Sequence, residues 1–161
     1  MARNRIETPH DPRDLPGDFG HAVDVEVRFA DTDAMGHVNN AVYLTYCEMA
    51  RIRYWTHVTG EPVAAGHEGA ESLILAEARI TYRAPVFHTE TVTIETRATH
   101  IGRSSFTLEH RLTARPPDGG ARLVATSASV MVRYDYRTDR PTPLSDAVIA
   151  SIEGFESRSL R

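Results

Sequence analysis

An apolar stretch without glycine or proline, residues 41–58, constrains the fold of this chain more than any other segment. It is too long for a strand, and Val42, Tyr46 and Met49 recur three or four residues apart, which predicts an α-helix. Apolar residues wrap most of the circumference of this helix, more than one core-facing stripe requires. We therefore expect a largely buried helix with a sheet curved around it.

Alternation of apolar and polar residues indicates strands in much of the remaining chain. Residues 23–29 alternate between apolar and charged, which predicts a strand with one buried face. Four further runs follow the helix, with apolar phases within residues 78–82, 92–98, 106–112 and 124–134. In the last run the apolar phase consists of the even-numbered residues.

Short links separate these later runs and indicate how they pair. Residues 84–88 break the first two runs, and residues 116–120 form a hairpin-type turn between the last two. Short links imply antiparallel neighbours. A short C-terminal helix is expected from Leu144 to Phe155, after two prolines. The fold class is therefore α+β, with about five antiparallel strands and one long helix.

Length and composition limit the classes of protein to which this chain can belong. A chain of 161 residues suits one domain, which we place at residues 21–161 after a flexible leader at residues 1–20. The net charge of −4 gives no indication of nucleic acid or an anionic membrane surface as partner. A single cysteine, no apolar run of 18 residues and no secretory h-region make the cytoplasm the expected location. Residues 60–69 contain three glycines and are expected to form a mobile loop.

The segment before the helix, residues 31–40, has the composition of a functional site. Its sequence DTDAMGHVNN lies between the first strand and the long helix. Either Asn39 or Asn40 is a suitable N-cap, and Val38 can pack onto the first turn. The free N–H groups and the positive end of the helix dipole at this point suit an anion or a developing oxyanion.

The turn D-x-D-x-x-G-H-V-N-N followed by a long helix and an antiparallel sheet resembles the hotdog-fold acyl-CoA thioesterases, specifically the 4-hydroxybenzoyl-CoA thioesterase-like family. The resemblance extends over residues 23–134 and includes segments 40–44, 80–85 and 101–106. It implies a homodimer or homotetramer with active sites at the subunit interface. It also implies that Asp33 matches the catalytic carboxylate and that the N–H near Asn40 polarises the thioester carbonyl.

The residues of the turn favour a CoA ester over an acyl-carrier-protein ester. Plant acyl-carrier-protein thioesterases carry a similar D-x-N-x-H-V-N-N turn with a catalytic Asn and His. In this chain Met35 stands at the position of that Asn, and Pro85 stands near the position of a later acidic residue. We therefore expect acyl-CoA as substrate, with hydrolysis of an acyl-carrier-protein ester as an alternative.

Thioester hydrolysis needs a nucleophile or activated water and a site for the oxyanion, but little help for the leaving thiol, whose pKa is about 8.5. Asp33 could attack the carbonyl or deprotonate a water, and the sequence does not distinguish these routes. Alternatively, Asp33 is only an Asx-turn residue. His37 could orient the substrate, relay a proton or form a loop contact. Asp31 is expected to brace the turn.

Several other residues have a functional and a structural interpretation. Glu48 rivals Asp33, because a second branch of hotdog thioesterases takes its carboxylate from the helix, but a surface ion pair with Arg51 or Arg53 is the favoured interpretation. Cys47 is expected to be a core residue, and His110 a core or interface residue. A possible site for the pantetheine or phosphates of CoA consists of Arg103, Ser104 and Ser105.

Other classes of function remain as alternatives. A metal-dependent hydrolase could use Asp31, Asp33 and His37 as ligands. A non-catalytic acyl-CoA-binding protein would share the fold, and a hotdog dehydratase is disfavoured because its catalytic residues are arranged differently. We expect a thioester hydrolase that needs neither a cofactor nor a metal.

Overall fold

The computed structural model describes residue 15, residues 18–63 and residues 71–161. Most of the predicted leader and most of the predicted loop at residues 60–69 lie outside the described residues. Near the end of the leader, the guanidinium carbons of Arg97 and Arg111 each lie 4.5 Å from the centroid of the Phe19 ring.

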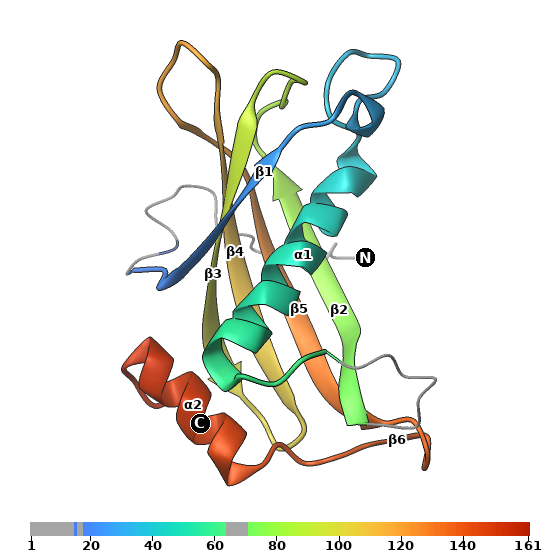
Figure 1. Ribbon diagram of the computed structural model, residues 1–161, viewed down its shortest axis with the longest axis vertical. Coiled ribbons are helices and arrows are strands. Elements are labelled where there is room, and N and C mark those ends of the chain that lie inside the picture. Colours follow the sequence, from blue (N-terminus) through green and yellow to red (C-terminus); the bar gives the residue numbers. More distant parts are fainter. Residues whose placement is uncertain (1–14, 16–17, 64–70) are drawn as a thin grey trace, which may run out of the picture.

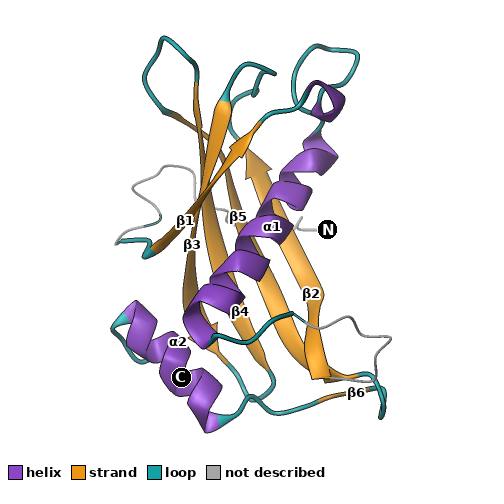
Figure 2. Ribbon diagram, in the orientation of Figure 1, coloured by secondary structure: helices purple, strands orange, loops and turns teal. Residues whose placement is uncertain are grey.

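An antiparallel six-stranded sheet curves around helix α1, Asn40–Thr59 (Figure 1), which confirms the predicted architecture. The strand order is β1-β3-β4-β5-β2, and a short β6 pairs with β5. Figure 2 shows the sheet behind α1 and the second helix at one end of it. The strands are β1, His21–Glu26; β2, Glu71–Tyr82; β3, Thr91–Ile101; β4, Ser105–Arg115; β5, Arg122–Asp135; and β6, Arg140–Pro141.

The expectation that short links join neighbouring strands holds for β3–β4 and β4–β5 but is wrong for β2 and β3. Strand β2 pairs along its length with β5, so the chain must cross to the other side of the sheet before β3 begins. The link over residues 83–90 makes this crossing. Its Val86 is fully buried, and the Val86 carbonyl accepts a 2.7 Å hydrogen bond from the Val38 N–H. The crossover thereby packs against the segment that precedes α1.

The predicted apolar phase of β5 lies mainly on the face away from α1. Ser127 pairs with His110, which is fully buried, so the odd-numbered residues in this part of β5 face the helix. Ser129 also faces α1, whereas Val130 and Val132 are half-buried on the opposite face. Small side chains on this face of β5 leave room for α1 to pack against the sheet. Hydrophobicity alone therefore predicted the wrong face of β5 as the one that faces the helix.

Helix α1 is less buried than its composition predicts. One side packs on the sheet, but Leu44 and Ile52 on the other side are 37% and 41% exposed. The second helix, α2, Asp146–Glu156, confirms the predicted C-terminal helix and packs near the carboxyl end of α1 (Figure 1). Neither of the described helices is long and apolar enough to cross a membrane.

Candidate active site

A buried carboxylate braces the turn between β1 and α1. The guanidinium of Arg28 donates to Asp31 Oδ1 at 2.7 Å, and the Tyr46 hydroxyl on α1 donates to Asp31 Oδ2 at 2.8 Å. These contacts, led by the side-chain bond from Arg28, hold the pKa of Asp31 below its ordinary value although burial opposes them. The Asp31 carbonyl also accepts a 2.9 Å hydrogen bond from the Asn39 N–H. Asp31 therefore ties the turn to the helix, as predicted.

The start of α1 leaves one backbone N–H without a hydrogen-bond acceptor among the described residues. Asn39 is the N-cap, and its Oδ1 accepts from the Ala41 N–H at 2.9 Å. The Val42 N–H donates to the Asn39 carbonyl at 3.0 Å. The Asn40 N–H precedes these two donors, and the described part of the chain offers it no hydrogen-bond acceptor. Of the two asparagines, Asn39 therefore caps the helix, while Asn40 supplies a free donor.

Asp33 is held by one oxygen and free at the other. The Met35 N–H donates to Asp33 Oδ1 at 2.9 Å, and the backbone closes a tight loop in which the Asp33 N–H donates to the His37 carbonyl at 3.0 Å. Gly36 adopts φ +83° in this loop, a left-handed conformation that favours glycine. Within the described residues, Asp33 Oδ2 accepts no hydrogen bond. The Asx-turn interpretation and a reactive carboxylate are therefore compatible.

A pocket of about 480 Å³ brings the predicted residues of the turn together. Asp33, His37 and Asn40 line it from the loop and the helix start. The crossover after β2 supplies Arg83, Ala84 and Pro85 as the opposite wall. Tyr82 also lines the pocket, and its hydroxyl donates to the Asn40 carbonyl at 2.7 Å. Segments far apart in the sequence therefore form one cleft around the free carboxylate oxygen and the free N–H.

His37 lines this pocket and forms one weak contact with the residues that the structure describes. Its Nδ1 lies 3.4 Å from the Val38 carbonyl, at the long end of hydrogen-bond distances. The ring is half-buried. This position is compatible with both predicted roles, a substrate contact and a loop contact.

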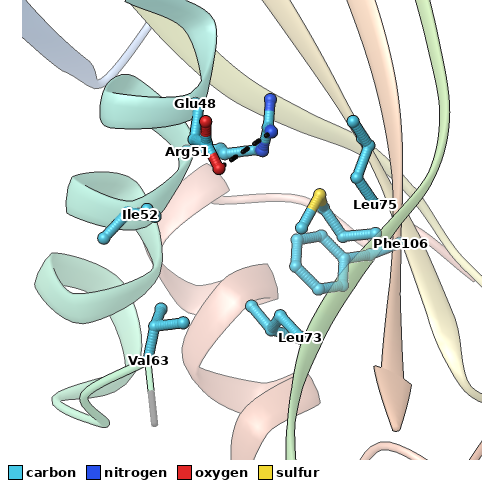
Figure 3. A pocket seen from close by; sticks show the side chains of 8 residues that line it. Glu48, Arg51, Ile52, Val63, Leu73, Leu75 and Phe106 are labelled. Carbon is cyan, nitrogen blue, oxygen red and sulfur yellow. Dashed lines mark ion pairs between the residues drawn. The ribbon is translucent and has the colours of Figure 1, made fainter. Parts of the chain in front are cut away.

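Glu48 lies in a different pocket from Asp33. It is on α1, 57% exposed, and forms an ion pair with Arg51 at 3.9 Å (Figure 3). The ion pair predicted from the helical spacing is therefore present. Within one chain Glu48 does not line the pocket that holds Asp33 and Asn40.

The residues predicted to contact CoA lie at the other end of the sheet. Arg103 is exposed in the β3–β4 hairpin, and its carbonyl accepts a 2.9 Å hydrogen bond from the Leu144 N–H, just before α2. The Asp33 turn precedes the start of α1, the end of that helix away from α2 (Figure 1). Ser104 and Ser105 are half-buried, and the Ser104 carbonyl accepts from the Arg133 N–H at 2.8 Å. One chain therefore does not place these three residues beside Asp33.

The two remaining candidates are core residues, as predicted. Cys47 is fully buried, and burial raises the pKa of its thiol to about 11. His110 is fully buried between Thr96 Oγ1, 3.0 Å from its Nδ1, and Ser129 Oγ, 3.4 Å from its Nε2. Burial lowers the pKa of His110 to about 3, so the ring is neutral near physiological pH.

The alternative metal site does not assemble from its predicted ligands. The Asp31 carboxylate is engaged by Arg28 and Tyr46 instead of facing the pocket. Within residues 18–63 and 71–161, no three His, Cys, Asp or Glu side chains are grouped in a way that could hold a metal ion.

Sequence reasoning missed three residues that shape the site. Arg28 is three residues before Asp31, a spacing that could have indicated a local ion pair. Tyr46 and Tyr82 were interpreted only as apolar members of a helix and a strand, yet their hydroxyls hold Asp31 and the Asn40 carbonyl. A buried tyrosine usually finds a hydrogen-bond partner, but the sequence does not identify that partner.

Known proteins share both the sequence pattern and the fold. Residues 27–152 match the thioesterase-like superfamily. A thioesterase from Thermus thermophilus, solved in complex with coenzyme A and Zn, is 34% identical, with a TM-score of 0.74 over 88% of this chain and 98% of that one. The 1,4-dihydroxy-2-naphthoyl-CoA hydrolase of Synechococcus elongatus is 27% identical over 74% of this chain and 85% of its own length.

The fold is also that of 4-hydroxybenzoyl-CoA thioesterase from Pseudomonas sp. strain CBS-3, which has a TM-score of 0.73 at 20% identity over 81% of this chain and 96% of that one. The hotdog fold predicted from the turn and the helix is therefore confirmed. The names of the relatives bear out the predicted enzyme class, a thioester hydrolase. With its family match spanning most of its length, the chain belongs to the thioesterase-like superfamily.

Proposed function

We propose that this protein hydrolyses acyl-CoA thioesters, with Asp33 as the reacting carboxylate and the Asn40 N–H as an oxyanion donor. One observation carries the proposal: Asp33 and Asn40 line the same pocket, and within the described residues Asp33 Oδ2 and the Asn40 N–H have no hydrogen-bond partner. A relative named as a CoA-ester hydrolase and a similar thioesterase solved in complex with coenzyme A support CoA as the leaving group.

The geometry supports two routes that differ in what Asp33 does. In the first, Asp33 Oδ2 attacks the thioester carbon, the C–S bond breaks, and water then hydrolyses the mixed anhydride. In the second, Asp33 takes a proton from water as the water oxygen attacks, and the departing thiolate later receives a proton. In both routes negative charge develops on the carbonyl oxygen, where the Asn40 N–H and the positive end of the α1 dipole stabilise it.

Substitution of Asp33 tests this proposal. Asp33→Asn keeps the size of the side chain and its Asx-turn acceptor but removes the charge, so we expect kcat to fall by about a hundredfold or more. Release of free thiol from a series of acyl-CoA esters measures the loss. Glu48→Gln makes the same charge change in the rival carboxylate on α1, so it is the matched comparison and should retain activity. Normal turnover by the Asp33 variant together with loss in the Glu48 variant would transfer the catalytic role to Glu48.

We also propose a homodimer that forms through the free edge of β2. Within the described residues one edge of β2 pairs with β5 and the other pairs with no strand. Leu75 and Tyr82 are each 42% exposed on this strand, and Ile52 is 41% exposed on the neighbouring helix. A long edge strand with exposed apolar side chains is prone to aggregation unless a partner covers it. A two-fold symmetric partner would cover the same surface on both subunits.

The charges on β2 favour one register for this pairing. Glu77 and Arg79 flank the small, exposed Ala78, and within one chain Arg79 Nε lies 3.0 Å from Glu77 Oε1, a pair that would be exchanged for the equivalent pair between subunits. If the two-fold axis passes through Ala78, antiparallel pairing places Glu77 opposite Arg79 of the second copy, an attractive cross-strand pair. The same register places residues 81–83, at the Asp33 pocket, beside residues 73–75 of the second copy. The catalytic pocket would then be completed by the partner subunit.

Charge reversal tests this register. Arg79→Glu brings like charges together and should shift the protein toward monomer in light scattering coupled to size-exclusion chromatography. Adding Glu77→Arg restores attraction and should restore the dimer. Arg115→Glu, an equal charge change on an exposed residue of β4, is the control. An unchanged mass for all three proteins would exclude the β2 interface as proposed.

The proposed CoA contacts depend on assembly as well. Since Arg103, Ser104 and Ser105 are distant from Asp33 within one chain, they would have to serve the pocket of another subunit, as in a dimer or tetramer. Arg103→Ala should then raise KM for acyl-CoA with little change in kcat. We place the reaction in the cytoplasm, where a free and buried Cys47 remains reduced.

A further inference from the structure

A second, smaller pocket lies between α1 and the sheet, at the far end of β2 from Asp33. Its volume is about 110 Å³, and Figure 3 shows its apolar side chains facing one another across the space between helix and strands. Its polar members are Glu48 and Arg51. The apolar lining consists of Ile52, Val63, Leu73, Leu75, Phe106 and Met131.

Arg51 is a charged residue in the otherwise mostly apolar lining of this pocket. Its side chain is 8% exposed, and its only ion-pair partner within the described residues is Glu48 at 3.9 Å. No described residue forms a hydrogen bond with its guanidinium, which has five N–H donors. Burial lowers the pKa of this guanidinium. The guanidinium nitrogens are not among the fully enclosed unpaired atoms, and Arg51 lines the pocket. A guanidinium in a largely buried side chain without a protein hydrogen-bond acceptor suits an acceptor that enters the pocket from outside the chain.

We propose that this pocket receives an acyl group ending in a carboxylate, and that Arg51 selects it. A carboxylate accepts two parallel hydrogen bonds from a guanidinium and compensates its charge, which a hydroxyl or a methyl group does not do. The apolar walls suit the methylene groups that join the two ends of such an acyl group. Because a cavity of about 150 Å³ holds benzene, a volume of about 110 Å³ limits the bound part to a short chain. The inference rests on the proposed function.

The thioester would have to lie at Asn40 while the carboxylate reaches Arg51. Along one helix these residues are eleven positions apart, roughly 16 Å at 1.5 Å per residue, too far for a short chain. The β2 register proposed above places Leu73 and Leu75 of one copy beside residues 81–83 of the other. The small pocket of one subunit then adjoins the Asp33 pocket of its partner, and a short acyl group connects them.

Glu48 sets the strength of this selection. Its side chain is 57% exposed, and within the described residues its one ion pair is the 3.9 Å contact with Arg51, so it can turn into solvent when a ligand carboxylate arrives. Until then it repels that ligand. Glu48→Gln should therefore strengthen the preference for a carboxylate-bearing acyl group, whereas loss of Arg51 should abolish it.

The test compares glutaryl-CoA with pentanoyl-CoA, which share chain length and differ in a terminal carboxylate or methyl group. The native protein should prefer the glutaryl ester. Arg51→Gln should lower kcat/KM for glutaryl-CoA by tens of fold, the effect expected when one partner of a buried charge pair is lost. It should leave pentanoyl-CoA nearly unaffected. Arg53→Gln, on an exposed neighbour in the same helix, should change neither ester.

Equal loss with both esters, or a native preference for pentanoyl-CoA, would overturn the proposal. A thermal melt of each variant detects misfolding, and Arg51→Lys, which keeps the charge without the planar fork, should retain part of the preference. If the native protein cleaves neither ester, the proposed function fails, and binding is then judged with free glutarate and free pentanoate. A rise in melting temperature with glutarate that disappears in Arg51→Gln supports the pocket, and no such rise refutes it.

Discussion

The brace beneath the catalytic turn yields a prediction whose size follows from the structure. Tyr46→Phe keeps the buried ring and removes only the hydroxyl that donates to Asp31 Oδ2 at 2.8 Å. A hydrogen bond to a charged group contributes about 1.5–3 kcal/mol. We expect the free energy of unfolding to fall by that amount, and the melting temperature of a domain this size to fall by about 3–12 °C.

Urea unfolding at pH 7.5, followed by circular dichroism, measures this difference. Tyr136→Phe is the control, because Tyr136 is 41% exposed and its hydroxyl has no hydrogen bond within the described residues. Its effect should stay below about 0.5 kcal/mol. The hydroxyl of Tyr46 should also matter for activity, since Asp31 ties the turn to the Asn39 N–H.

The pH dependence of the stability loss in Tyr46→Phe distinguishes the hydrogen bond to Asp31 from a loss of packing. Contacts led by the Arg28 side chain lower the pKa of Asp31 in the folded state. Their contribution to stability is therefore complete above the unfolded value of about 3.9 and is lost as pH falls through the folded value. The difference between native protein and Tyr46→Phe should shrink below about pH 4. A loss under about 0.5 kcal/mol at pH 7.5, or one that persists unchanged in acid, would refute the reasoning.

Three further predictions concern buried or half-buried groups. Burial lowers the pKa of His110 to about 3, so below pH 6.5 the unfolded chain binds a proton that the folded protein does not. The free energy of unfolding should therefore decrease as the pH falls below 6.5, by up to about 1.4 kcal/mol per pH unit. In urea titrations, the free energy of unfolding of His110→Gln should depend less steeply on pH. With a thiol pKa of about 11 and no exposure, Cys47 should react with a disulfide reagent only after denaturation, and iodoacetamide should leave activity intact. Tyr82→Phe removes the bond to the Asn40 carbonyl, and steady-state kinetics should show lower kcat with less than about 1 kcal/mol lost in stability.

The helix and most strands could be predicted from the sequence because apolar residues recur in each with one regular spacing. The helix assigned to residues 41–58 is observed as Asn40–Thr59. Local pattern failed where a long-range choice decided the outcome. The link at residues 84–88 is as short as a hairpin turn, yet β2 does not pair with β3. It pairs with β5, the last long strand in the sequence. In the middle of β5 the apolar Val130 and Val132 face away from α1, whereas the smaller Ser127 and Ser129 face it.

For the site, sequence alone brought Asp33, His37 and Asn40 together because they lie within one short turn. It did not find the opposite wall at residues 82–85, which reaches the turn only through the crossover of the chain. It also treated Arg51 merely as a surface partner for Glu48, because helical spacing does not reveal that Arg51 is 8% exposed. Residues that are adjacent in sequence can be grouped from the sequence, whereas a wall from a distant segment needs the topology.

The loop before α1 should be unable to vary in length, although it lies at the surface. Thr32 and Val38 form a β-bridge at its base, and Gly36 turns the chain between them. An inserted residue would break that bridge and move Asp33 away from the Asn40 N–H, even though surface loops usually accept insertions at small entropic cost. The turn at residues 116–121 lines neither pocket around α1 and is under no such restriction. Length variation among functional variants of this enzyme should therefore concentrate there, and peptide tags should be inserted at that turn.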